Sequence, residues 1–200
     1  MGNREDLLLA AKRCLLEKGY DRTTVRDIAT AADVSMAAIG YHYGSREALL
    51  NEALFQTLAD WGDRVGGALA PDPEVPDTPA AQFESKLSRL IDSFAADRQI
   101  WLASVEAFMQ AQRSPELREQ LAAGQLDGRR GLAAMVTGQP EDEVAESEVR
   151  SVGAVQLALI SGLMIQWLGD AATAPTASEV MKGLRTLLGV PSDGPPPNPA

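Results

Sequence analysis

Cysteine and histidine are nearly absent from this sequence, which has one of each, Cys14 and His42, among 200 residues. A single cysteine forms no internal disulfide, and this fits a reducing cytoplasm. One cysteine and one histidine do not make a set of soft ligands for zinc. A Ser-His-acid triad would depend on His42 alone, and no glycine-rich phosphate loop is found. We therefore expect no enzyme, no metal and no cofactor.

Long apolar runs are also missing. The first six residues are polar and acidic and do not form a secretory signal. The most apolar stretch, residues 152–168, is interrupted by Gln156, Ser161 and Gln166, so it is too short and too polar for a good membrane span. We expect a cytoplasmic protein that does not enter a membrane.

Positive charge is scarce, with 18 Lys and Arg against 28 Asp and Glu, and the net charge is −10. The excess is not evenly spread. Residues 1–50 hold seven residues of each sign, whereas residues 51–200 hold eleven basic and twenty-one acidic residues. Such asymmetry is more informative than the total charge. A neutral N-terminal part joined to an acidic body would suppress non-specific DNA binding, because such binding depends on attraction to the phosphates.

Helical periodicity dominates what is present, and no convincing strand alternation is found. We predict an all-α protein of about nine helices: an N-terminal three-helix head (residues 1–50), a helical body (51–189) and a disordered proline-rich tail (190–200). Glycine or proline marks several of the predicted boundaries: Gly19 ends the first helix, and Ser114-Pro115 opens the helix predicted over 115–136. The predicted helices cover residues 4–18, 25–30 (before a turn at 31–34), 36–42, 45–70, 79–96, 98–112, 115–136, 143–169 and 177–188.

The stretch from Thr24 to Leu50 has the pattern of a helix-turn-helix. Thr24 is a suitable N-cap, and Asp27 three residues later can complete a capping box. A turn follows, and Ser35 and Ser45 are expected to cap the next two helices. Two short helices joined by a tight turn are the size of a DNA-reading unit.

The residues of this stretch show a resemblance to a known family. The pattern resembles the N-terminal domain of the TetR (tetracycline repressor-like) family over about residues 5–54. It departs from the family at three positions. Gly40 stands where the family often has an aromatic residue, Tyr43 where it often has Phe, and Arg46 where it often has Lys. The matching positions are Gly19-Tyr20, Thr23-Thr24-Val25, Ile28-Ala29, Ala32, Val34-Ser35, Ile39, Tyr41-His42-Tyr43, Ser45-Arg46-Glu47 and Leu49.

The resemblance implies a double-stranded DNA operator as partner and places several residues at DNA contacts. These are Thr24, Ser35, Tyr41, His42 and Arg46. The residues themselves suggest further DNA contacts. Small or apolar side chains in the second helix of the motif could meet thymine methyl groups or let the helix backbone come close to the DNA, and an exposed arginine could meet a phosphate. These additional candidates are Met36, Ala37, Ala38, Gly40 and Arg26. The alternative is that Tyr41 and His42 only cap and pack the head.

The body contains a candidate ligand site. Large apolar side chains and one glutamine recur on one face of the helix predicted over 98–112, and two more lie on the helix predicted over 143–169. The resemblance implies that such bodies often enclose a small effector, and this composition suits a largely apolar molecule. The candidates are Trp101, Val105, Phe108, Met109, Gln112, Met164 and Trp167. The alternative for each is ordinary core.

Two functions remain open from the sequence. The first is a DNA-binding transcriptional regulator, a repressor released from a near-palindromic operator by the effector. It would be a homodimer through the helices predicted over 143–169 and 177–188, because the former is apolar nearly all round. The second is a dimeric helical interaction module that no longer reads a specific operator, and Gly40 is the residue that supports it.

Overall fold

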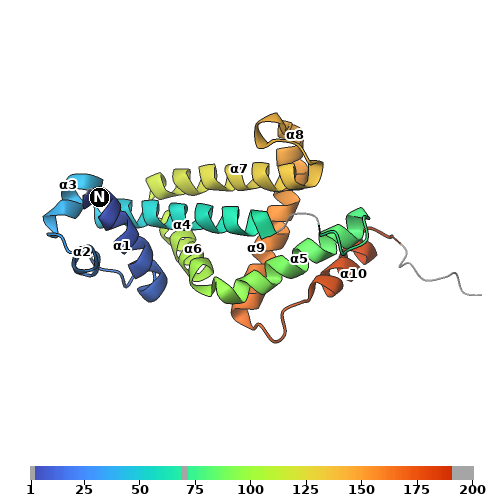
Figure 1. Cartoon of the computed structure of the whole chain (residues 1–200), viewed down its shortest axis with the longest axis horizontal. Coiled ribbons are helices and arrows are strands. Elements are labelled where there is room, and N and C mark those ends of the chain that lie inside the picture. The colour runs from blue at the N-terminus through green and yellow to red at the C-terminus, as the bar shows by residue number, and fades with distance from the viewer. Residues whose placement is uncertain (1–2, 69–71, 191–200) are drawn as a thin grey trace, which may run out of the picture. The chain divides into compact units, whose positions relative to one another are not determined.

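The structure is a computed structural model that describes residues 3–68 and 72–190 (Figure 1). Over these residues it is helical and contains no strand, which confirms the predicted all-α class. Counting residues 146–169 as one helix, the described residues form nine α-helices, as predicted. Their bounds are α1 (Asn3–Lys18), α2 (Val25–Ala32), α3 (Ala37–Tyr43), α4 (Arg46–Ala68), α5 (Pro79–Ala96), α6 (Arg98–Ala111), α7 (Pro115–Thr137), α8 (Glu146–Glu148), α9 (Ala154–Gly169) and α10 (Ala177–Leu187).

The chain divides into two compact units. The first contains residues 1–64 and 97–162, and the second contains residues 65–96 and 163–200. Two of the three divisions fall inside α4 and α9, and the third falls between α5 and α6. The predicted proline-rich tail, apart from Val190, lies outside the described residues.

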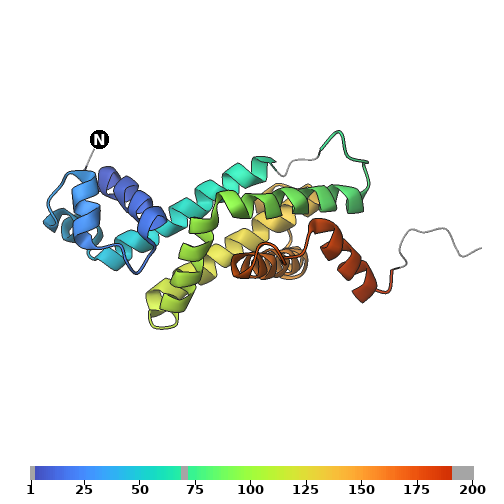
Figure 2. The same cartoon turned by 90° about the horizontal axis from the view of Figure 1, so that it is seen from below.

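The head at the N-terminal end of the first unit consists of α1, α2, α3 and the start of α4 (Figures 1 and 2). Its local signals act as predicted. Gly19 follows α1 with φ +85°, and its N–H donates to the Leu15 carbonyl. Thr24 and Asp27 form the complete capping box of α2. The turn after α2 has Asp33 in the left-handed conformation, so that the chain reverses between the two helices of the motif.

The core of the head includes side chains from α6. Fully buried leucines and isoleucines of α1, α2, α3 and α4 form one cluster, and Ala103 and Ala107 of α6 belong to the same cluster. Alanine is small enough to let two helices approach closely, and Ala10, Ala11 and Cys14 of α1, in the same cluster, are also small. Cys14 is buried, and burial raises the pKa of its thiol.

The second helix of the motif begins differently from the prediction. Ser35 does not cap it with its side chain. Instead α3 starts at Ala37, one residue later than expected, and its N-cap position, Met36, makes no side-chain capping bond. The Ser35 backbone carbonyl accepts the Ala38 N–H at 3.0 Å, so the backbone closes this turn itself. Ser45 does cap as predicted, since its hydroxyl accepts the Ala48 N–H at 3.0 Å.

The prediction of one continuous helix over 143–169 is also wrong at the start of that helix. Residues 141–143 form a separate 3₁₀ turn, and regular helix begins at Glu146. Between α8 and α9, residues Val149–Gly153 form a π-helix that packs on α7. A Cβ added to Gly153 would lie 2.1 Å from the Arg129 carbonyl oxygen. The two backbones thus touch here, and the apolar periodicity carries no signal of such a contact.

The second unit has its own small core. Leu87, Leu90 and Phe94 of α5 are buried, and the Trp167 ring of α9 lies 6.3 Å from the Phe94 ring. The helix α10 packs beside α5 (Figure 1). A capping box of Thr176 and Glu179 begins α10.

In the described part of the chain one helix, Glu146–Gly169, is long and apolar enough to cross a membrane, by length and composition alone. Val155 and Ile165 are the large apolar side chains most exposed along α9. The core helix of a water-soluble protein can have the same length and composition.

Candidate DNA-reading surface and ligand-binding residues

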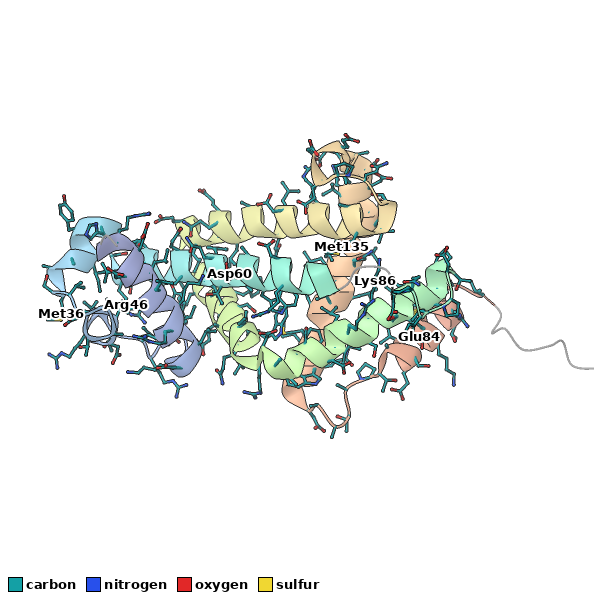
Figure 3. All side chains as sticks on the ribbon, in the orientation of Figure 1. Met36, Arg46, Asp60, Glu84, Lys86 and Met135 are labelled. Carbon is teal, nitrogen blue, oxygen red and sulfur yellow. The ribbon has the colours of Figure 1, made fainter. Side chains whose placement is uncertain are left out.

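The outer face of α3 is exposed and carries no formal charge. Met36, just before the helix, is 52% exposed and lies at the outer edge of the head (Figure 3). Ala37, Gly40 and Tyr41 follow on the same side at helical spacing, and Tyr41 is 86% exposed. Ile39 points inward and is buried. This surface can offer methyl groups, backbone and one hydroxyl to a ligand, and few hydrogen-bonding groups for base edges.

The remaining predicted contact residues of the motif divide by exposure. Thr24 and Ser35 are exposed, whereas Ala38 and His42 are half-buried. The His42 ring packs edge-on against Tyr41, with centroids 4.9 Å apart. The Thr24 hydroxyl is engaged with the Asp27 carboxylate at 2.6 Å, so an anion would compete with that bond.

Arg26 is exposed on α2, one residue before Asp27. Hydrogen bonds from Lys18 and then from Thr24 hold the pKa of the Asp27 carboxyl well below its usual range. Lys18 is therefore paired with Asp27 within the head, and the phosphate contact of Arg26 stays a prediction.

Arg46 has contacts within the protein that the sequence did not reveal. Its Nε donates to the Thr23 carbonyl, and one terminal nitrogen donates to the Tyr20 carbonyl at 2.6 Å and the Asp21 carbonyl at 3.2 Å. The other terminal nitrogen pairs with Glu47 at 3.1 Å. The side chain is only 19% exposed. Arg46 therefore fastens the segment between α1 and α2, and its predicted phosphate contact stays a prediction.

Tyr20 anchors the same segment from within. It is buried, and its hydroxyl donates to the Asn51 side-chain carbonyl of α4. Burial raises the pKa of the Tyr20 hydroxyl to about 12, so the hydroxyl stays protonated and remains a donor. The helix-turn-helix is thus mounted on a rigid support whose polar groups are satisfied.

The structure distributes the predicted ligand residues over both units. In the first unit Trp101 is buried and Val105 half-buried, but Phe108 and Met109 are 53% and 63% exposed, and Gln112 is exposed. The sequence pattern placed these on one inward face of α6. The face that α6 buries most deeply is formed instead by Ala103, Ala107 and Ala111. In the second unit Met164 is buried and Trp167 half-buried.

Trp61 is a candidate that sequence reasoning missed. It lies on α4, and its ring packs edge-on against Trp101 of α6, with centroids 4.5 Å apart. Its indole Nε1 is buried and has no acceptor among the described residues. A buried donor without a partner is costly, so we expect an acceptor that lies outside the described residues. The periodicity of α4 could have indicated Trp61, since it follows Leu54 and Leu58 on one face.

Two family models match the chain. The model described as bacterial regulatory proteins, tetR family, matches residues 7–53, and the model of the tetracyclin repressor-like C-terminal domain matches residues 78–190. The first match covers the head, and the second covers more than half of the whole chain.

Individual relatives agree with these matches. The transcriptional regulator TtgR of Pseudomonas putida is 24% identical over 173 residues, 82% of this chain and 80% of that protein. The repressor KstR2 of Rhodococcus jostii is 39% identical over 59 residues, 30% of this chain and 29% of that protein.

Solved structures share the fold. The multidrug binding protein EbrR complexed with proflavin has a TM-score of 0.65 at 22% identity, and the match covers 93% of this chain and 99% of that chain. With both its head and its C-terminal region matched, this chain belongs to the tetR family of bacterial regulatory proteins and is a helix-turn-helix transcriptional regulator.

Proposed function

We propose that the protein is a dimeric cytoplasmic repressor that leaves a near-palindromic operator when a small, largely apolar effector binds its body. The observation that carries the DNA-binding half is the outer face of α3, which is exposed, uncharged and mounted on a closely packed head. An uncharged reading face gives little affinity for phosphate, so it can contribute to binding only through close contact with the groove.

The contacts to DNA follow from this surface. Met36, Ala37, Ala38 and Gly40 meet base edges and methyl groups in the major groove, and Tyr41 and His42 reach the backbone. Thr24, Arg26, Ser35 and Arg46 contact phosphates and sugars at the edge of the groove. So few base-reading side chains give one head modest specificity. The two heads of a dimer, held at a fixed spacing near a whole number of helical turns, supply the rest.

Dimerisation through α9 and α10 fits the exposed apolar surface of both helices. On α9, Val155 and Ile165 are 59% and 52% exposed, and on α10 Leu187 is 84% exposed. Burying such side chains against a second copy stabilises by about 1.5–3 kcal/mol for each one fully covered. The apolar character of residues 146–169 then serves a protein interface and not a membrane.

The effector half of the proposal depends on the aromatic side chains of the body. Trp61 and Trp101 lie together in the first unit, and Trp167 packs on Phe94 in the second. EbrR, which shares this fold, is described as a multidrug binding protein and was crystallised with proflavin, a planar aromatic molecule. We infer an effector with an apolar ring system and an acceptor for the Trp61 indole N–H. Val105, half-buried on α6 in the same unit as Trp61 and Trp101, would line the ligand beside them.

Release requires the effector to prefer the conformation that does not bind the operator. A tenfold preference corresponds to about 1.4 kcal/mol, and a switch from 1:99 to 99:1 needs roughly 5.5 kcal/mol. Thermodynamic reciprocity then makes operator DNA weaken the effector by the same factor.

The second candidate function, an interaction module without a specific operator, is favoured by Gly40. This glycine lies in helical conformation with open space around it, so the fold itself does not require it. Selection from random duplexes with the purified protein decides between the two functions. Enrichment of a near-palindrome that binds at least about a thousandfold more tightly than random duplex at physiological salt supports the regulator. Equal affinity for all duplexes supports the interaction module.

A further inference from the structure

The segment joining α1 to α2, residues 19–23, is held by helices from outside the helix-turn-helix. We refer to it as the α1–α2 corner. Arg46 and Asn51 of α4 bind it from one side, as described above. On another side it meets α6, which belongs to the body in sequence but lies in the same compact unit as the head.

The first contact with α6 is a charge-assisted hydrogen bond. The Tyr20 backbone N–H donates to a Glu106 carboxylate oxygen at 2.6 Å, and the bond is partly buried. Bonds of this kind are roughly twice as strong as neutral ones. Gly19 makes the approach possible, because a Cβ at this position would lie 3.2 Å from both Glu106 oxygens. The position also has φ +85°, which favours glycine in any case.

The second contact lies one helical turn further along α6. The Gln110 side-chain nitrogen donates to the Asp21 carboxylate at 2.8 Å. Glu106 and Gln110 are four residues apart and therefore share one face of the helix. Beside them, Ala103 and Ala107 are buried in the core of the head. The two polar contacts thus lie beside an apolar contact. Together the three contacts fix both the orientation of the head on α6 and its distance from this helix.

We propose that Glu106 and Gln110 are positioning residues for operator binding. Neither side chain lies on the reading face. They hold the α1–α2 corner so that α2 and α3 meet the operator in one orientation. The proposal rests on the proposed function, since orientation matters only where two heads must engage one site together. Non-specific binding depends on phosphate neutralisation and does not need this orientation.

The test compares variants on two kinds of duplex. Glu106→Ala removes the acceptor, whereas Glu106→Gln keeps an oxygen that can accept the Tyr20 N–H without the charge. Gln110→Ala removes the second contact. Gln99→Ala, an exposed glutamine on the same helix, and Glu119→Ala, an exposed glutamate on α7, are the matched controls. Affinity is measured for the duplex selected by the wild-type protein and for random duplex, at several salt concentrations.

We expect Glu106→Ala to weaken the selected duplex by about tenfold or more, and Glu106→Gln by clearly less. Affinity for random duplex and its salt slope should stay at wild-type values, as should both affinities in the controls. Hydrogen exchange of the Tyr20 amide, which needs no DNA, should be faster in Glu106→Ala and nearly normal in Glu106→Gln. Thermal melting checks that every variant is folded at the assay temperature.

Four results in the variants would overturn the positioning role. One is wild-type operator affinity in Glu106→Ala together with faster Tyr20 exchange. Another is an equal loss on both kinds of duplex, which indicates a general structural defect. The third is a loss in Glu106→Gln as large as in Glu106→Ala. A wild-type protein that selects no duplex overturns the proposed function itself, and this proposal with it, while unchanged Tyr20 exchange in Glu106→Ala overturns this proposal alone.

Discussion

Gly40 and Gly44 lie four residues apart, in α3 and at its end, and differ in backbone conformation. Gly40 is helical and Gly44 has φ +79°, and a Cβ would have open space at both. Alanine in a helix is favoured over glycine by about 0.5–1 kcal/mol. Alanine at a positive φ costs about 1–3 kcal/mol. We therefore expect Gly40→Ala to raise the melting temperature and Gly44→Ala to lower it.

The Gly40→Ala variant also tests whether Gly40 contributes to operator binding. If the backbone of α3 approaches the groove closely at this position, Gly40→Ala weakens operator binding even though it stabilises the free protein. A stabilised variant with unchanged operator affinity would mean that the glycine is merely tolerated there. A destabilised Gly40→Ala would contradict the helical conformation of residue 40.

Asp27 makes the stability of the head depend on pH. Its pKa is lowered by hydrogen bonds from Lys18 and Thr24, so the folded state favours the charged form. The resulting stability is present above the ordinary value of 3.8 and is lost as the pH falls toward the lowered pKa. We expect Asp27→Asn to melt at a lower temperature than wild type at neutral pH. The gap should narrow below about pH 4. Asp92→Asn, exposed on α5, should show no such gap.

Trp61 gives the effector proposal a test at one atom. 9-Fluorenone and fluorene share a planar ring system, and only the former has a carbonyl that can accept the indole N–H. A hydrogen bond to a buried donor contributes about 0.5–1.5 kcal/mol, so fluorenone should bind about twofold to twelvefold more tightly than fluorene. Trp61→Phe keeps an aromatic ring and should abolish the difference. A preference that persists in Trp61→Phe would assign the acceptor to another group. Binding is measured by quenching of Trp101 and Trp167 fluorescence in that variant.

At the scale of helices, Gly153 controls how α7 meets the π-helix before α9. The Arg129 carbonyl oxygen would lie 2.1 Å from an added Cβ, a distance no side chain tolerates. Gly153→Ala must push the two helices apart, and we expect a loss of stability of about 1–3 kcal/mol or more. Gly162→Ala, in α9 with open space for its Cβ, is the control and should be neutral or stabilising. Chemical denaturation of both variants measures the difference.

The helices that were predicted well are those with signals in their own residues. Four helix ends are set by local hydrogen bonds, as predicted. The residues that set them are Thr24 with Asp27, Gly19, Ser45, and Ser114-Pro115 at the start of α7. Local caps do not depend on the rest of the fold, so a sequence can reveal them. The start of α3 was misplaced by one residue because a backbone carbonyl replaced the expected serine cap.

Contacts between distant segments were not predictable in this way. The burial of Ala103 and Ala107 against α1 depends on which helix lies opposite them. Alanine has so little apolar surface that hydrophobic periodicity does not mark such a face as buried. For the same reason Phe108 and Met109 looked inward by periodicity, but the structure exposes them. The bonds of Arg46 to three carbonyls also depend on the tertiary fold, whereas its position in the family pattern suggested only DNA.

For the whole molecule, the decisive property is its oligomeric state. We expect a dimer by sedimentation at micromolar concentration. Glutamate placed at Ile165 of α9 and Leu187 of α10 would bury unpaired charge in that interface, and Ile165→Glu with Leu187→Glu should raise the dissociation constant at least about a hundredfold. Leu126→Glu, which changes an exposed leucine on α7, should leave the dimer intact. A wild-type monomer at these concentrations would contradict the proposed interface.

The presence of α6 alanines in the core of the head has a consequence for synthesis on the ribosome. All helices of the DNA-reading motif have been made once residue 54 is complete, but Ala103 and Ala107, which cover α1, are still missing. At about 5–20 residues per second, the chain needs roughly 3–10 s more to supply them. During that interval the part of α1 that packs on α6 stays uncovered. A nascent chain therefore completes the core of its head only after most of α6 has emerged.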